Sequence, residues 1–93
     1  MIIKNFSYDE TVEMANEDIK VIKEDILPML KNQNAFSFAD IDLIATAFLN
    51  VGSRMNIFSK VDKPEAKKLY SEYSALVKEM FYLIEEKEEL ENE

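Results

Sequence analysis

The chain contains no cysteine and no histidine among its 93 residues. The absence of both residue types excludes disulfides, thiolate chemistry and the ligands that most zinc sites use, and it removes the commonest general base of enzymes. The sequence also has no glycine-rich phosphate loop and no serine–histidine–aspartate set. We therefore expect a protein without catalytic residues, metal ligands or a cofactor, and not an enzyme.

Glycine and proline are scarce as well, with one glycine and two prolines in the whole chain. Such a composition favours helices over sheets, because glycine and proline mark the turns that short strands require. The length suits one domain, and the hydrophobic fraction of 47% suits a globular one. The composition therefore predicts a single all-α domain that spans residues 1–93.

Positive charge is the third scarce feature, since 11 basic residues face 19 acidic ones and the net charge is −8. Nucleic-acid binding needs clustered lysine and arginine, so an acidic chain suits a basic protein partner instead.

The sequence has no apolar run of about 18 residues, and the opening MIIKNF is too short for the apolar core of a signal peptide. We expect a cytoplasmic protein that binds neither nucleic acid nor membranes.

The first predicted helix starts at Tyr8, where Ser7 and Glu10 have the spacing of a capping box. Pro28 lies within the helical pattern, so the helix should kink or restart there. At about 1.5 Å per residue, the piece before the kink would be about 30 Å long, and its early turns could extend beyond the bundle. The apolar residues of this helix recur at the spacing of one helical face: Val12, Ala15, Ile19, Ile22, Ile26 and Leu30.

A second helix is predicted from Phe38 to about Phe58, after a weaker cap signal at Ser37 and Asp40. This segment is apolar nearly all round, which predicts a central helix that is buried on several sides. Gly52 lies in its middle, and close approach by a neighbouring helix is favoured over a hinge as the explanation.

A third helix should begin near Asp62 and Glu65, which have capping-box spacing, with Pro64 in the first turn. Residues 85–93 are acidic and are expected to form a frayed, solvated tail. Together the segments predict a small three-helix bundle with a long, Pro-kinked first helix. The third helix carries its apolar stripe at Ala66, Leu69, Tyr73, Leu76, Met80 and Leu83.

Two sets of polar and aromatic residues in the first helix could serve a site. The acids of EDIKVIKED, at 17–25, fall on the polar face and lack the histidines of known helical di-metal sites, so a solvated face is favoured over a metal site. Tyr8 and Val12, flanked by acids, could insert into a basic pocket of another protein. They could equally cover the end of the bundle, and the pattern leaves both alternatives open.

The segment SRMNIFSKVDKPEAKKLYSEYSALVKEM, at 53–80, resembles the epsilon family of antitoxins, which neutralise zeta toxins in bacterial toxin–antitoxin modules. Members of that family carry an Arg-hydrophobic-Asn-hydrophobic-Phe run at the end of a central helix, and the residues from Arg54 to Phe58 match it in order. The resemblance extends upstream through DLIATAFLNVG, and SYDETVEM is similar to the Tyr-x-x-Thr start of the family, with Tyr8 and Thr11 in place. It covers most of the chain.

The resemblance implies a three-helix antitoxin that dimerises within a two-plus-two complex. Its first helix would obstruct the ATP site of a zeta toxin, a P-loop kinase associated with phosphorylation of UDP-N-acetylglucosamine. The implied inhibition needs no chemical reaction, because the helix would fill the ATP site. Its carboxylates would pair with the lysines and arginines that otherwise hold phosphates. The toxin-binding residues expected on the first helix are Tyr8, Asp9, Thr11, Val12, Glu13, Ala15, Asn16 and Ile19.

One position departs from the family, since a bulky aromatic is common four residues after the tyrosine and this chain has Val12. A smaller side chain there implies weaker insertion or a toxin pocket of another shape. Two other functions remain open at this point. One is a bacteriocin-type immunity protein or another small acidic helical interaction module, and the other is an acidic mimic of nucleic acid.

Overall fold

The computed structural model describes the backbone of residues 6–91 and the side chains of residues 6–87. It is an all-α bundle of three helical segments, as the sequence predicts, and its described residues contain no strand. The first segment consists of α1 (Tyr8–Val21), a π-helical turn η1 (Ile22–Ile26) and α2 (Leu27–Asn32). The second is α3 (Phe38–Phe58) and the third is α4 (Pro64–Glu91).

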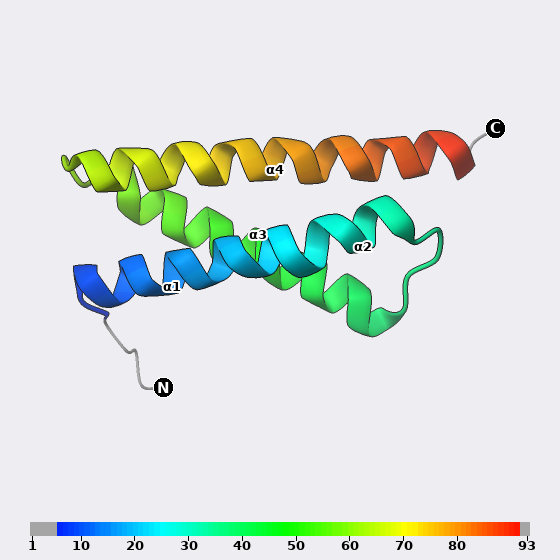
Figure 1. Cartoon of the computed structure of the whole chain (residues 1–93), viewed down its shortest axis with the longest axis horizontal. Coiled ribbons are helices and arrows are strands. Elements are labelled where there is room, and N and C mark those ends of the chain that lie inside the picture. The colour runs from blue at the N-terminus through cyan, green and yellow to red at the C-terminus, as the bar shows by residue number, and fades with distance from the viewer. Residues whose placement is uncertain (1–5, 92–93) are drawn as a thin grey trace.

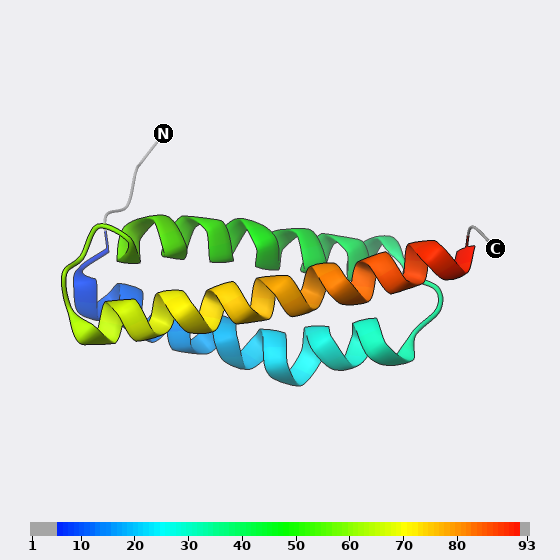
Figure 2. The same ribbon diagram turned by 90° about the horizontal axis from the view of Figure 1, so that it is seen from above.

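Helix α4 packs over the other two segments. Figure 1 shows α4 along one side of the bundle, with the α1–α2 segment and α3 beneath it. The view from above shows α4 between the other two, with α3 along one edge and the α1–α2 segment along the opposite edge (Figure 2). The turn between α2 and α3 lies at the same end of the bundle as the end of α4.

The first two of the three predicted helix starts are confirmed as capping boxes. The backbone N–H of Glu10 donates to Ser7 Oγ at 3.1 Å, and the N–H of Ser7 donates to Glu10 Oε1 at 3.3 Å. Ser37 and Asp40 make the same reciprocal pair at 3.1 and 3.0 Å. Each pair satisfies two groups that a helix N-terminus leaves without intrahelical partners, which fixes where the helix begins.

The expected break at Pro28 takes the form of a π-helical turn. Pro28 lacks an N–H and stands at the start of α2, directly after η1. The wider turn accommodates a residue that has no N–H donor, and the helix continues beyond it, because a π-bulge inserts one extra residue into the helical hydrogen-bond pattern. The apolar stripe continues through it, and Ile22, Ile26 and Leu30 are all buried.

The core is formed mainly by α4 and the α1–α2 segment. All six residues of the predicted α4 stripe are buried, with Ala66, Tyr73 and Met80 fully so. The ring of Tyr73 stacks on that of Phe58 from α3, with centroids 6.5 Å apart. The α1 side contributes Ala15 and Ile19.

The prediction that α3 is buried on several sides is wrong. Only Ala47, Val51 and Phe58 of α3 are buried, whereas Phe38 and Leu49 are 92% and 74% exposed. A bundle of three helices can cover a helix only on the side of its two neighbours, so the remaining apolar side chains of α3 face outward. The prediction that a neighbouring helix approaches closely at Gly52 is also wrong, since a Cβ added there would meet no atom of the chain within 4 Å.

The last helix differs from the prediction at its start. Its first backbone hydrogen bond runs from the N–H of Lys67 to the carbonyl of Lys63 at 3.1 Å, so Lys63 stands at the cap position. Asp62 instead forms an exposed ion pair with Lys67 Nζ at 3.1 Å. The helix continues through the acidic segment to Glu91, and residues 92–93 and the side chains of 88–91 lie outside the described part.

None of the helices within residues 6–91 combines the length and the apolar character that crossing a membrane requires.

Candidate functional site

Helix α1 is tied to both neighbouring helices by a polar cluster of Asp18, Arg54 and Tyr73. The hydroxyl oxygen of Tyr73 lies 3.1 Å from the carbonyl oxygen of Ala15 and 3.2 Å from Asp18 Oδ2. Arg54 Nε lies 3.5 Å from the same carboxylate oxygen. Since α1, α3 and α4 each contribute one side chain to the cluster, it fixes the rotation of α1 about its own axis.

The cluster is largely shielded from water, which changes the acidity of its members. The side chains of Arg54 and Asp18 are 13% and 19% exposed, so solvent screens their attraction only weakly. Burial raises the pKa of Asp18 above its ordinary value, although the Arg54 charge and the hydrogen bond from Tyr73 lower it. Burial and the charge of Asp18 raise the pKa of Tyr73, so its hydroxyl stays protonated and remains a donor.

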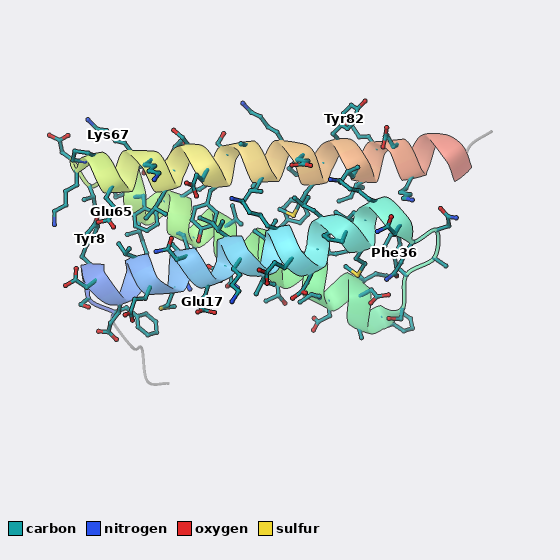
Figure 3. The ribbon with its side chains drawn as sticks, in the orientation of Figure 1. Tyr8, Glu17, Phe36, Glu65, Lys67 and Tyr82 are labelled. Carbon is teal, nitrogen blue, oxygen red and sulfur yellow. The ribbon has the colours of Figure 1, made fainter. Side chains whose placement is uncertain are left out.

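The start of α1 lies against the connection between α3 and α4 and does not overhang the bundle. The ring of Tyr8 meets that of Phe58 edge to face, with centroids 6.4 Å apart, and Lys63 Nζ lies 4.1 Å above the Tyr8 ring. The Tyr8 hydroxyl is enclosed and faces Glu65 (Figure 3). Burial is the largest cause that raises the pKa of Tyr8, and the negative charges of Glu65 and Asp9 raise it further. The expectation of early turns beyond the bundle is therefore wrong.

The outward side of α1 is polar and mostly acidic. Figure 3 shows Glu17 pointing away from α4, into solvent. A shallow hollow of about 610 Å³ follows this side of the helix, beside Arg54. The exposed polar residues of α1, called here the acidic α1 face, are Asp9, Glu10, Glu13, Asn16, Glu17 and Lys20.

The structure divides the eight expected toxin-binding residues into three groups. Asp9, Glu13 and Asn16 are exposed together on the acidic α1 face, and Tyr8 and Val12 are half-buried at its border. Thr11, Ala15 and Ile19 point into the bundle, with 5%, 0% and 6% of their surface exposed. These three are out of reach of a partner that docks on the folded chain.

Thr11 has a clear structural role instead. Its hydroxyl donates to the carbonyl oxygen of Ser7 at 2.8 Å, so the polar group is satisfied although the residue is buried.

Sequence reasoning missed several residues of this region. Glu10, Glu17 and Lys20 join the acidic α1 face, although they were not among the expected toxin-binding residues. Glu10 and Glu17 lie three and four positions from Glu13, and Lys20 lies three from Glu17, which was the available signal. The pairing of Arg54 with Asp18 was also missed. A lone arginine within an apolar run requires a carboxylate partner, but the sequence offers 19 candidates.

No family model matches the chain, and comparisons with curated proteins and with solved structures give no match. Among the described residues, no group of three or more acidic side chains is arranged to hold a metal ion.

Proposed function

We propose that this chain is an antitoxin, similar to the epsilon family, that binds and neutralises a zeta-type P-loop kinase toxin. The observation that carries the proposal is the acidic α1 face, presented at a fixed rotation by the cluster of Asp18, Arg54 and Tyr73. The resemblance of Arg54 to Phe58 to the family motif supplies the class of partner. The chain itself contributes no reaction chemistry.

The charge of the acidic α1 face suits the ATP site of a kinase. Such a site holds phosphate groups with lysine, arginine and backbone N–H donors. Carboxylates from Asp9, Glu13 and Glu17 would accept charge-assisted hydrogen bonds from the same donors. Inhibition then follows from occupancy, because α1 and the nucleotide compete for one volume and one set of positive charges.

The burial of each side chain decides which of the expected residues can contact the toxin directly. In this proposal Asp9, Glu13 and Asn16 touch the toxin, and Tyr8 and Val12 contribute the edges that remain exposed. Thr11, Ala15 and Ile19 keep α1 packed on the bundle and so act through its position. A rigid helix loses little conformational entropy on binding, which favours affinity.

The assembly implied by the resemblance belongs to the same proposal. A homodimer of this chain would carry one toxin on each copy, as a two-plus-two complex in the cytoplasm. The toxin would be a kinase of the UDP-N-acetylglucosamine class.

The first test is co-expression with the reading frame that neighbours this one in its genome. We expect a stable complex that contains a P-loop kinase, and growth arrest when the kinase is expressed alone. A neighbour that is neither toxic nor bound would overturn the proposal and leave an acidic helical interaction module without an assigned partner.

The second test is charge reversal on the acidic α1 face. Glu13→Lys should weaken toxin binding by about tenfold or more, since it replaces an attractive contact with a repulsive one. Glu86→Lys is the matched control, because Glu86 is exposed and belongs to the C-terminal end of α4, which lies away from α1 in Figure 1. Isothermal titration calorimetry at two salt concentrations measures both variants. Equal losses for the two variants would rule out the α1 face as the contact surface.

A further inference from the structure

A groove lies between α3, α4 and the α2–α3 turn, and we call it the α3–α4 groove. Its volume is about 390 Å³, which falls within the range of about 300–1,000 Å³ that small-molecule sites occupy. Phe48 and Phe81 stack beside it with ring centroids 4.9 Å apart. Phe36 lies at the turn that closes one end (Figure 3). The apolar residues that line the groove are Leu30, Phe36, Ile41, Ile44, Phe48 and Ile84.

One charged side chain also lines the groove. Lys87 is half-buried, and its Nζ donates to Asn34 Oδ1 at 3.2 Å, so a neutral amide of the α2–α3 turn holds the ammonium group in place. Within residues 6–87, Lys87 forms no ion pair with a carboxylate. An ammonium group carries three N–H donors, so two of them remain for a ligand. The groove therefore combines apolar walls with one positioned cation.

This combination selects a ligand that has an apolar body and a carboxylate at one end. The body gains from burial of its CH₂ groups, and the carboxylate gains a charge-assisted hydrogen bond from Lys87. A cationic amphiphile would face the ammonium group with a like charge. The net charge of −8 also disfavours an anionic membrane or an acidic protein, since either would meet many carboxylates of the chain, whereas one small anion meets only the groove.

The size of the groove limits the length and width of its ligand. On α3 the lining runs from Ile41 to Phe48, which is seven residues or about 10 Å. An aliphatic chain of about eight to ten carbons has that length. A partner helix with its side chains is about 10–12 Å across, so two turns of it would occupy roughly twice the volume of the groove. The groove is therefore too small for a helix and suits a narrow chain.

We propose that the α3–α4 groove binds a medium-length aliphatic carboxylate, with its carboxylate on Lys87 and its chain along the apolar walls toward Phe48. This site goes beyond the proposed antitoxin function and does not rest on it, because it involves neither the acidic α1 face nor a toxin.

The test is isothermal titration calorimetry of the purified full chain with a series of straight-chain carboxylates, from hexanoate to tetradecanoate, below the concentrations at which they form micelles. We expect decanoate to bind one site with a dissociation constant of about 0.1 mM. Each added CH₂ should tighten binding by about threefold, until the groove is full at about ten carbons and the gain stops. Affinity that keeps rising with length throughout the series would indicate non-specific association and overturn the proposal.

The contribution of Lys87 is measured by a comparison of octanoate with octanol. Lys87→Gln should weaken octanoate binding by about threefold to fivefold and leave octanol binding unchanged, because only the carboxylate pairs with the ammonium group. Lys78→Gln is the matched control, since Lys78 is exposed on α4 and nine positions away, which is half a turn round the helix from Lys87. Equal effects of the two variants on octanoate would overturn the role of Lys87.

Ala45→Phe tests whether the chain of the ligand occupies the groove. Ala45 lines the groove and is exposed, so a larger side chain there fills the groove without entering the core. The variant should weaken decanoate binding by about tenfold or more, whereas its circular dichroism spectrum and its thermal unfolding should match those of the wild type. In methyl NMR spectra of the wild type, decanoate should shift the signals of Ile44 and Ile84 but not that of Ile19, which lies on α1 outside the groove.

Three further results would overturn the proposal. The first is no binding of any carboxylate in the series, and the second is binding that Ala45→Phe leaves intact. The third is another occupant of the groove: phosphatidylglycerol vesicles that bind the wild type but not Ala45→Phe would assign it to a membrane surface, and self-association that Ala45→Phe abolishes, measured by sedimentation equilibrium, would assign it to a second copy. Because no toxin is present in these experiments, their outcomes are distinct from those that test the antitoxin function.

Discussion

Tyr73 of α4 donates its hydroxyl across the bundle to the backbone carbonyl of Ala15 in α1, at 3.1 Å, and both residues are fully buried. The same hydroxyl lies 3.2 Å from Asp18 Oδ2. A single phenol therefore links the backbone and a carboxylate of α1 to the opposite layer. It holds the helix that presents the acidic α1 face.

Tyr73→Phe should destabilise the bundle by about 2 kcal/mol, because it removes a buried donor and leaves the Asp18 carboxylate with one partner fewer. Urea unfolding followed by circular dichroism measures the change. Tyr82→Phe is the control, since it removes the same atom from a side chain that is 63% exposed, and it should be neutral. A neutral result for Tyr73→Phe would mean that the hydroxyl contributes nothing to stability.

Asp18 should make the stability of the chain depend on pH. Its pKa is raised in the folded state by burial, so the folded chain binds its proton more tightly than the unfolded chain does. This contribution is fully present below the unfolded pKa of about 4, and it is lost as the pH rises through the folded value. The unfolding free energy of the wild type, relative to Asp18→Asn, should therefore fall between acidic and neutral pH. A constant or rising difference would contradict the raised pKa.

Tyr8→Ala should cost about 1 to 2 kcal/mol of stability, because it removes the edge contact with Phe58 and the ring beneath Lys63. Tyr82→Ala, on the exposed side of α4, should cost less than about 0.5 kcal/mol. Thermal unfolding compares the two variants. Equal, small effects would show that the start of α1 is not packed on the bundle in solution.

Pro28→Ala tests the π-helical turn. A proline in a regular helix interior costs about 3 kcal/mol, so its removal there would give a large gain in stability. Here η1 already accommodates the proline, and a return to a regular helix would rotate α1 relative to α2 and disrupt the buried stripe on both sides. We expect a change within about 1 kcal/mol by urea unfolding, whereas a gain near 3 kcal/mol would mean that the turn is only a consequence of the proline. Ala75→Pro in α4 serves as a control, because it places a proline in a regular helix interior, and it should lower the free energy of unfolding by about 3 kcal/mol.

The helix positions were predictable because their signals are local. The capping boxes at Ser7 and Ser37 involve residues three apart, and the α4 stripe depends only on the helical repeat, so both were correct. The start of α4 was less predictable, since Asp62 has the spacing of a cap but pairs with Lys67 instead.

The candidate site was predictable only in part. Periodicity placed Ala15 and Ile19 on the apolar stripe of the first helix, but the family resemblance included them among the contact residues, and they are buried. The partner of Arg54 was not predictable, because any of many carboxylates could have met it until the rotation of α1 was known.

The sequence by itself determined that this protein is helical, where its first two helices begin and which stripe of the first and last helical segments turns inward, because these properties arise from contacts within a few residues. Only the tertiary structure decided that Tyr8 packs on Phe58, that Asp18 faces Arg54 and Tyr73, and that α3 lies at an edge with Phe38 and Leu49 exposed. Those relationships depend on how many helices surround each helix and at what rotation. Contacts between residues distant in the sequence set that arrangement, so a local pattern cannot specify it.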